Sequence, residues 1–239
     1  MKISIVTAVY NSVDDLSCLI DSLRNQTDKD FDWVVADGGS VDGTLEVLRS
    51  INDLDLKVIE GPDFGIYDAL NKAIKKCKGE YYLAVGADDV LHSEAISIFK
   101  GEVEKNQLAD MVTCPVRYAD EIRLPKGRFP WLYGQFSYIS MHSVGLLIRK
   151  DLHSKLGYYS RKYPIAADQF FILKAISHGA MIMKGQTIVG VHGSQGVSGV
   201  DSRGVITEFF RVQVELGHNK YVQTALCCLR LIKNIFREI

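Results

Sequence analysis

Hydrophobic positions in the first half of the chain alternate between short continuous runs and runs with helical spacing. Apolar residues spaced three or four positions apart, such as Leu16, Leu19, Ile20 and Leu23, predict amphipathic helices between the continuous runs. The continuous runs are typical of buried strands and occupy residues 3–9, 31–36, 56–59 and 80–85. Strands that alternate with helices predict an α/β fold with a mostly parallel sheet flanked by helices.

The clearest helix and strand pair lies within residues 65–90. Apolar residues from Tyr67 to Cys77 share one helical face, and Gly79 ends the helix. The following strand ends in two adjacent carboxylates, Asp88 and Asp89. Ligands of open α/β sheets bind beyond the carboxyl ends of the strands, so these side chains offer oxygen ligands to a hard divalent cation. A turn with two solvated aspartates is the alternative.

The second half of the chain has a less regular pattern. Residues 119–140 carry prolines, glycines and aromatic residues without a clear period, which predicts a long connection that shapes a pocket. Further helices and strands are predicted at residues 93–105, 111–118, 143–149, 151–156, from 168 onward and 188–191.

Composition excludes several classes of protein. The chain has 239 residues, 47% of them hydrophobic, which suffices for one substantial core. A net charge of -1 lacks the basic surplus of nucleic-acid-binding proteins, so no nucleic-acid partner is expected. With no signal-peptide pattern and no membrane-spanning apolar run, the expected location is cytoplasmic. The cysteines show neither metal-ligand nor disulfide spacing and are expected to be reduced core residues: Cys18, Cys77, Cys114, Cys227 and Cys228.

Polar loops follow successive predicted strands and should meet at one edge of the sheet. They contain Thr7, Tyr10 and Asn11; residues 37–40; Asp63 with residues 65–68; and residues 86–89. This ordered series resembles family 2 glycosyltransferases, which are nucleotide-sugar enzymes of the GT-A fold. The similarity continues through residues 142–143 and 167–168 to 196–198, and therefore covers roughly the first 200 residues.

The resemblance implies a domain organisation as well as a fold. A GT-A domain is expected over residues 1–204, with a nucleotide-binding half at 1–118 and an acceptor-side half at 119–204. Residues 205–239 would form a C-terminal helical extension.

The implied donor is a nucleotide sugar, with a UDP-sugar expected. By resemblance, Asp37 would accept a hydrogen bond from the N3–H of uracil, and a turn cap is the alternative role. Tyr10 would stack on the base, whereas core packing is its alternative. The remaining candidates for nucleotide-sugar binding are Thr7, Asn11, Asp68 and Asp88.

The resemblance also implies a divalent metal, Mn²⁺ or Mg²⁺. Asp88 and Asp89 match the family's variant of the DXD motif, although Gly86 and Ala87 precede the pair. Asp89 would ligate a cation that bridges the diphosphate, because bare carboxylates repel a diphosphate. Asp88 would reach the ribose or the metal. His192 is a second candidate ligand, with an ordinary loop histidine as the alternative.

Asp168 is the candidate catalytic base. Its Ala-Asp-Gln-Phe context resembles the family's acidic motif at a helix start, although Ala167 replaces Glu and Gln169 replaces the frequent aromatic residue. As a base it would deprotonate the acceptor hydroxyl in an inverting transfer. A charge that stabilises the helix N-terminus is the alternative. His142 is a candidate on the acceptor side, with a hydrogen-bonded core histidine as the alternative.

The final segment, residues 220–239, has the pattern of a basic amphipathic helix. Such a helix can lie on an anionic membrane, here the inner face of the cytoplasmic membrane, or pack on its own domain or on a second subunit. By resemblance, the acceptor is a glycan or a lipid-linked hydroxyl, and the setting is bacterial surface polysaccharide assembly.

The sequence disfavours three other function classes. A sugar nucleotidyltransferase normally has a Gly-rich basic loop after the first strand, which residues 7–11 lack. A dinucleotide-dependent oxidoreductase needs G-x-G-x-x-G at that point, which is also absent. A non-catalytic nucleotide-sugar-binding subunit would not need to retain Asp37, Asp88, Asp89 and Asp168.

Overall fold

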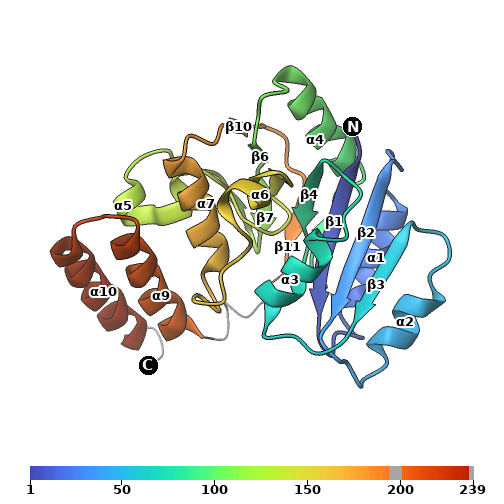
Figure 1. The fold of residues 1–239 in the computed structure, drawn as a ribbon, viewed down its shortest axis with the longest axis horizontal. Helices are drawn as coiled ribbons and strands as arrows, with labels where there is room; N and C mark the ends of the chain where they lie inside the picture. Colours follow the sequence, from blue (N-terminus) through green and yellow to red (C-terminus); the bar gives the residue numbers. More distant parts are fainter. Residues whose placement is uncertain (194–200, 237–239) are drawn as a thin grey trace.

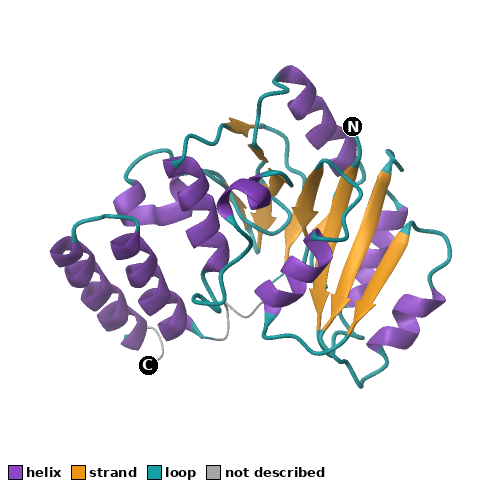
Figure 2. Ribbon diagram, in the orientation of Figure 1, coloured by secondary structure: helices purple, strands orange, loops and turns teal. Residues whose placement is uncertain are grey.

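The computed structural model describes residues 1–193 and 201–236 and shows a large central sheet with helices on both faces (Figure 1, Figure 2). The strand order of this sheet is β10-β6-β9-β4-β1-β2-β3. Its strands are β1 (Ile3–Val9), β2 (Phe31–Asp37), β3 (Leu56–Glu60), β4 (Tyr81–Ala84), β6 (Met111–Thr113), β9 (Leu146–Arg149) and β10 (Ile182–Lys184).

The pairing within the sheet is mostly parallel. β1 pairs in parallel with β2 and β4, β2 with β3, and β6 with β10, while β9 runs antiparallel to β4 and β6. Strands β1, β2 and β4 are buried almost throughout, because helices cover both of their faces. The predicted α/β fold is confirmed.

Two apolar clusters hold the helices to the sheet. One face packs against α1 (Leu16–Arg24), α2 (Thr44–Ser50) and α4 (Ala95–Lys105). The other face packs against α3 (Ile66–Ile74), α6 (Leu152–Leu156) and α7 (Ala167–Ser177). α3 and α7 therefore begin on the same face of the sheet, which brings their first turns toward one cavity.

The sequence predicts one strand over residues 111–118, and this prediction is wrong because the structure has two strands there. The segment divides into β6 and β7 (Val116–Tyr118), and β7 joins a second sheet of order β5-β11-β7-β8. Pro115 lies between the two and has no N–H to donate to a strand ladder, so the chain leaves the first sheet there. The other strands of the second sheet are β5 (Val90–Leu91), β8 (Glu121–Arg123) and β11 (Gly190–His192).

The long connection at residues 119–140 contains short elements of secondary structure. Besides β8 it contains α5 (Pro130–Tyr133) and the 3₁₀ turn η1 (Gly134–Ser137). Beyond it, α9 (Ser202–Glu215) and α10 (Lys220–Ile235) lie side by side at the end of the molecule away from β3 (Figure 1). α9 begins before the expected boundary at residue 205 and packs on α7 through the buried Val212.

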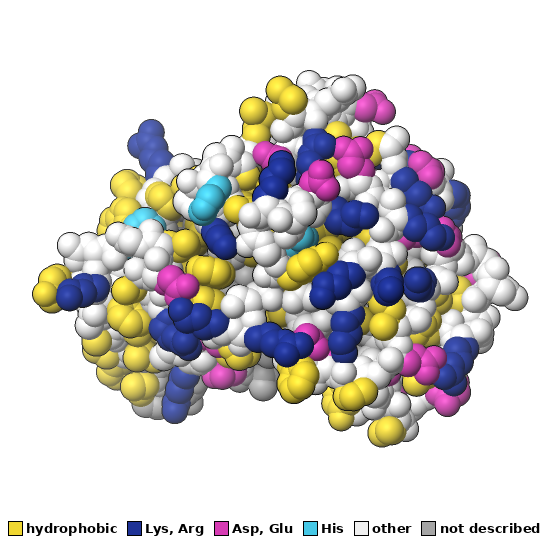
Figure 3. Space-filling model, viewed as in Figure 1, with side chains coloured by type: hydrophobic (Ala, Val, Ile, Leu, Met, Phe, Trp, Pro, Cys, Tyr) yellow, Lys and Arg dark blue, Asp and Glu magenta, His cyan; other side chains and the backbone are white. Residues whose placement is uncertain are grey.

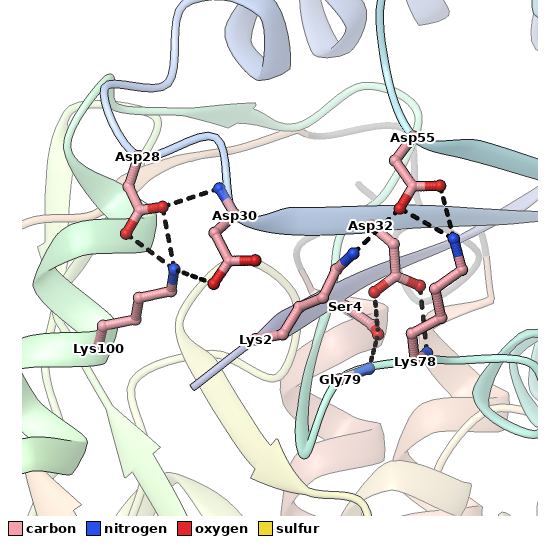
Figure 4. Close-up of polar contacts among 9 residues, drawn as sticks. All are labelled: Lys2, Ser4, Asp28, Asp30, Asp32, Asp55, Lys78, Gly79 and Lys100. Atoms are coloured by element: carbon pink, nitrogen blue, oxygen red, sulfur yellow. Dashed lines mark hydrogen bonds and ion pairs between the residues drawn. The ribbon is translucent and has the colours of Figure 1, made fainter.

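Polar contacts tie the strands together at the amino ends of β1, β2 and β4 (Figure 4). Ser4 Oγ donates to Asp32 Oδ1 at 2.7 Å and accepts from Gly79 N at 2.8 Å. A Cβ on Gly79 would lie 2.6 Å from Ser4 N, so only glycine fits there. Gly79 therefore serves this close approach of β4 to β1, whereas its predicted role as the helix stop is wrong, because α3 already ends at Ile74.

The cysteine expectation holds only in part. All five cysteines are free, but only Cys77 and Cys114 are buried, and burial raises the pKa of each thiol to about 12. Cys18 and Cys228 are exposed and Cys227 is half-buried, because they lie on outward parts of α1 and α10. An apolar run in a helix does not by itself place each member in the core.

Candidate functional site

A cavity of about 240 Å³ lies where the loop after β4 meets the first turns of α3 and α7. Five of the predicted site residues line it: Asp88, Asp89, His142, Asp168 and His192. Its apolar wall includes Phe136 from η1 and Phe209 from α9, so the 119–140 segment and α9 complete it. The predicted pocket-shaping role of residues 119–140 agrees with this placement.

Asp89 is fully buried and holds four hydrogen bonds at the cavity wall. Its Oδ1 accepts from His192 Nδ1 and from Gly193 N, both at 2.8 Å. Its Oδ2 accepts from Gly86 N at 2.6 Å and from Ser143 Oγ. The loop after β4 and the end of β11 are therefore joined through one carboxylate.

Opposite effects act on the protonation of this pair. Burial raises the pKa of Asp89, but the hydrogen bonds from His192, Ser143 and Gly193 outweigh it and leave the pKa below its usual value. Burial lowers the pKa of His192, whereas the neighbouring Asp89 carboxylate raises it, and the net direction is upward. Asp89 is therefore an ionised carboxylate despite its burial.

The Asp89 and His192 side chains fit two neighbouring positions around a divalent cation once His192 Nδ1 releases the proton that it donates to Asp89. Their facing atoms lie 2.8 Å apart, close to the roughly 3 Å edge of an octahedron with metal–ligand bonds of about 2.1 Å. Among residues 1–193 and 201–236, no group of three or more His, Cys, Asp and Glu side chains forms a fuller metal site. The remaining ligands of a metal here would come from water or from a bound anion.

Asp88 lies against the loop at the end of β11. A Cβ on Gly193 would lie 2.0 Å from Asp88 Oδ2, so only glycine permits this approach. Asp88 also lines the cavity, and a Cβ on Gly86 would lie 3.0 Å from its Oδ1 and 3.1 Å from Asp89 Oδ2. The acidic pair is thus held in place rather than solvated as in an ordinary turn.

Asp168 lies in the first turn of α7, and its carboxylate is held by two side chains. Tyr67 Oη lies 2.7 Å from Oδ1, and Gln135 Nε2 donates to Oδ2 at 2.9 Å. Burial, followed by the Asp168 charge, raises the pKa of Tyr67, so this hydroxyl stays protonated and can donate. The structure therefore gives Asp168 a fixed orientation at the cavity in addition to its place at a helix N-terminus.

Tyr67 and Gln135 were not predicted as site residues. The sequence placed Tyr67 on an apolar helical face, and Gln135 lies in the irregular segment without any pattern. The Gly65–Ile66–Tyr67–Asp68 loop at a strand end was a signal for Tyr67, whereas no local signal pointed to Gln135.

His142 is hydrogen-bonded within the protein, as its alternative role requires, and also lies at the cavity. Its Nε2 lies 2.8 Å from Tyr159 Oη, and its ring also lines the cavity. Burial lowers the pKa of His142 and favours the neutral ring.

Apart from Asp88, the predicted nucleotide-binding residues do not line this cavity. Thr7 is buried and its Oγ1 accepts from Trp33 Nε1 at 3.0 Å. Its hydroxyl therefore joins β1 to β2 inside the sheet. Tyr10 is 65% exposed, so the alternative of core packing is wrong. Asn11 joins two loops, donating through N to Ser40 Oγ at 2.8 Å and accepting from Val41 N through Oδ1 at 2.9 Å.

Asp37 is buried at the end of β2 and caps the following turn. Its Oδ1 accepts from Gly39 N at 2.9 Å and from Ser40 N at 3.0 Å. The turn-cap role is therefore present. The exposed ring of Tyr10 lies beside the same turn, since a Cβ on Gly38 would be 3.4 Å from Tyr10 Cδ2.

Asp68 forms an ion pair away from the cavity. Arg161 Nη2 donates to its Oδ1 at 2.6 Å, and Phe64 N donates to its Oδ2 at 3.3 Å. Burial raises the pKa of Asp68, but these hydrogen bonds outweigh it and the pKa is lowered. The carboxylate thus ties the start of α3 to residue 161.

We expect Asp68→Asn to lower the free energy of unfolding by about 1–3 kcal/mol at neutral pH, because a buried hydrogen-bonded carboxylate is lost. A lowered pKa stabilises the fold above the unfolded-state pKa near 4, and this stability is lost as the pH falls through the folded-state pKa. The difference between variant and wild type should therefore shrink on acidification. Urea unfolding at several pH values measures it, with the exposed Asp14→Asn as control. An unchanged midpoint for Asp68→Asn would contradict this assignment.

Comparison with known proteins identifies the family and the fold of this chain. Residues 4–162 match the family model described as glycosyl transferase family 2. The PGL/p-HBAD biosynthesis glycosyltransferase of Mycobacterium tuberculosis is 28% identical over 200 residues, which cover 78% of this chain and 74% of the relative.

Two solved structures show the same fold. The crystal structure of S. aureus TarS 1-349 in complex with UDP-GlcNAc superposes with a TM-score of 0.75 at 21% identity, over 97% of this chain and 72% of that one. The mannosyltransferase PcManGT from Pyrobaculum calidifontis, in complex with GDP-Man and Mn²⁺, gives a TM-score of 0.70 at 17% identity. That match covers 97% of this chain and 74% of PcManGT.

Proposed function

Because the chain belongs to glycosyl transferase family 2, we propose that this glycosyltransferase moves a sugar from a UDP-sugar to an acceptor hydroxyl with inversion. The observation that carries the proposal is the convergence of two different acidic groups on one cavity. The Asp89–His192 pair is suited to a cation, and Asp168 is oriented as a base.

The donor is proposed to lie along the carboxyl ends of β1, β2 and β4. Asp37 and Tyr10 would hold the base at the end of β2, and Asp88 would reach the ribose or the metal. The choice of uridine rests on the resemblance to the family and on the UDP-GlcNAc complex of TarS. PcManGT binds GDP-Man, so the nucleotide is part of the test.

Asp89 and His192 are proposed to hold Mn²⁺ or Mg²⁺. Such a cation would neutralise the diphosphate as it leaves. Gly86, Ser143 and Gly193 orient the Asp89 carboxylate through hydrogen bonds, which is the usual support for a metal ligand. The Mn²⁺ complex of PcManGT supports the choice of metal.

Asp168 is proposed to take the proton from the acceptor hydroxyl. Tyr67 and Gln135 fix its carboxylate, so its basic oxygen is presented in one orientation. A single displacement by that hydroxyl inverts the anomeric carbon. The acceptor is proposed to be a glycan or a lipid-linked molecule of bacterial surface polysaccharide assembly, and His142 would lie on its side of the cavity.

The proposal is tested by UDP release from a panel of UDP- and GDP-sugars with Mn²⁺ or with chelator. Metal-dependent release from a UDP-sugar is expected, and an α-linked donor should give a β-linked product by NMR of the anomeric proton. Retention of configuration would contradict the single displacement. Binding of UDP-sugars without any turnover would instead identify a binding subunit.

The apolar stripe of α10 does not pack on its own domain. Leu229 is 62% exposed and Phe236 is 74% exposed, and Val222 and Ile232 are also exposed. Figure 3 shows hydrophobic and basic side chains together at the left of the molecule, over the C-terminal helices. No helix among the described residues is long and apolar enough to cross a membrane.

The opposite face of α10 is polar and faces the body of the protein. Gln223 Nε2 donates to the carbonyl of Trp131 at 2.7 Å, and Arg230 Nη2 donates to that of Leu132 at 2.6 Å. Because these contacts satisfy carbonyl groups of the short helix α5, the apolar residues are left on the outside. We propose that the outward stripe lies on an anionic membrane surface.

We expect the double variant Leu229→Ser/Ile232→Ser to lose most of its co-sedimentation with anionic liposomes, because about 0.8 kcal/mol per buried CH₂ is removed. Both residues are exposed, so the fold should be unaffected. Leu108→Ser removes another exposed leucine, distant in sequence from α10, and is the matched control. Equal sedimentation of all proteins would contradict the membrane contact. If the wild type forms a dimer and the double variant does not, the stripe binds a second copy of the chain instead.

A further inference from the structure

A chain of buried hydrogen bonds leads from the cavity into the core. His142 Nε2 lies 2.8 Å from Tyr159 Oη, which lies 2.8 Å from Tyr82 Oη. Tyr82 Oη lies 2.7 Å from His153 Nε2, and His153 Nδ1 lies 3.2 Å from the carbonyl oxygen of Gly157. The chain thus has one end at the cavity and the other at a backbone carbonyl.

The carbonyl fixes the direction of every bond in this chain. A carbonyl oxygen only accepts, so His153 must carry its proton on Nδ1. Burial lowers the pKa of His153 to about 4, so the ring is neutral and its Nε2 accepts. Tyr82 therefore donates to His153, and its oxygen accepts the proton of Tyr159. The oxygen of Tyr159 is then left to accept from His142.

His142 must consequently carry its proton on Nε2. Burial lowers its pKa, so the ring is neutral and Nδ1 has only a lone pair. Nδ1 has no hydrogen-bond partner within residues 1–193 and 201–236, and the ring lines the cavity. Reversing the chain would place a bare His153 Nδ1 against the Gly157 oxygen, which is repulsive.

The surrounding packing holds the chain in one arrangement. Asn71 brackets the backbone of Tyr159, donating to its carbonyl at 2.8 Å and accepting from its N–H at 3.0 Å. The His153 ring stacks on Phe171 with centroids 4.3 Å apart. All of the linking side chains are buried, so water does not compete for these bonds.

We propose that Tyr159, Tyr82 and His153 are positioning residues that lock His142 as a hydrogen-bond acceptor for a substrate hydroxyl. The inference rests on the proposed function for the identity of that substrate, a sugar or other polyol. A neutral ring with only a lone pair toward the cavity favours a hydroxyl donor over a phosphate or carboxylate, which would need a donor from the protein.

The tautomer is tested by NMR of the histidine ring nitrogens in ¹⁵N-labelled full-length protein, with His142 assigned from the signal that His142→Asn removes. The wild type should show a protonated Nε2 and a bare Nδ1. In Tyr82→Phe the Tyr159 hydroxyl loses its acceptor and turns to donate to His142, so the proton should move to Nδ1. Tyr81→Phe is the matched control, since Tyr81 precedes Tyr82 on β4 and its hydroxyl donates to the Ala109 carbonyl instead.

Ligand recognition is tested by titrating D-glucose as a hydroxyl probe and inorganic phosphate as an anionic probe. Glucose should shift the Nδ1 signal in wild type and Tyr81→Phe, whereas Tyr82→Phe should bind it at least ten-fold more weakly. A shift with phosphate but not glucose would overturn the proposed ligand class.

A protonated Nδ1 in the wild type would overturn the inference even if UDP-sugar turnover is normal. Conversely, absent turnover with the expected tautomer would contradict only the proposed function. If Tyr82→Phe does not fold, Tyr159→Phe removes the partner of His142 directly, and its tautomer should become mixed. An unchanged tautomer in a folded Tyr159→Phe protein would also overturn the inference.

Discussion

An Asp168→Asn variant should turn over about 10² to 10⁴-fold more slowly than the wild type while binding the nucleotide sugar as before. The amide keeps the size of the side chain but cannot take a proton from the acceptor hydroxyl. Tyr67 can still donate to the amide oxygen, so the first turn of α7 should keep its position. Initial rates of UDP release and calorimetric donor affinity measure the two effects separately.

The control for this variant separates the loss of a catalytic base from the loss of a negative charge in the first turn of a helix. Glu46→Gln also removes one carboxylate from the first turn of a helix, α2, but does so outside the cavity. It should leave the rate within about two-fold of the wild type, since a first-turn carboxylate contributes only about 0.3–1 kcal/mol through the helix dipole. Normal turnover by Asp168→Asn would show that Asp168 is not the base, even though the chain belongs to this family.

An Asp89→Asn variant should lose both rate and donor binding, with metal affinity reduced by about 100-fold or more because a direct ligand is replaced. Its effect therefore differs from that of Asp168→Asn, which should spare binding. Stability should also fall by about 1–3 kcal/mol, since an amide turns its NH₂ group toward donors that now bond the carboxylate. Mn²⁺ titration by calorimetry with UDP present, and a melting curve, record the two losses.

Ser143→Ala distinguishes a metal effect from a folding effect. It removes one hydrogen bond of Asp89 Oδ2 but keeps the carboxylate and its charge. Stability should therefore fall as in Asp89→Asn, by about 1 kcal/mol, whereas Mn²⁺ affinity should fall far less. Equal Mn²⁺ affinity in Asp89→Asn and wild type would exclude Asp89 as a ligand.

The sequence was sufficient to predict most strands of the sheet and the three acidic residues that line the cavity, Asp88, Asp89 and Asp168. Apolar periodicity reports local conformation, and parallel strands bring their carboxyl ends to one edge. Carboxylates in the short loop after a strand, as Asp88 and Asp89 are after β4, therefore lie at this edge of the sheet. The start of α7 was likewise predicted from residues next to Asp168.

Roles that depend on a distant partner could not be predicted. Thr7 lies within β1 and Asp68 in the first turn of α3, and Thr7 bonds Trp33 whereas Asp68 bonds Arg161. Their polar groups form hydrogen bonds that stabilise the fold. The periodic pattern of apolar residues does not predict which distant residue forms each bond. Gln135, in the irregular segment, donates to Asp168, and this contact also could not be predicted because the two residues are distant in sequence.

By itself, the sequence determined that this is an α/β protein with acidic groups at the ends of its strands, because these features follow from neighbours in the chain. Only the tertiary structure decided which of them act together. His192 reaches Asp89 across 103 positions and Tyr67 reaches Asp168 across 101. It also decided that α10 turns its polar face inward, because the carbonyls of α5 need donors there. Such contacts depend on how whole elements pack, which local periodicity does not encode.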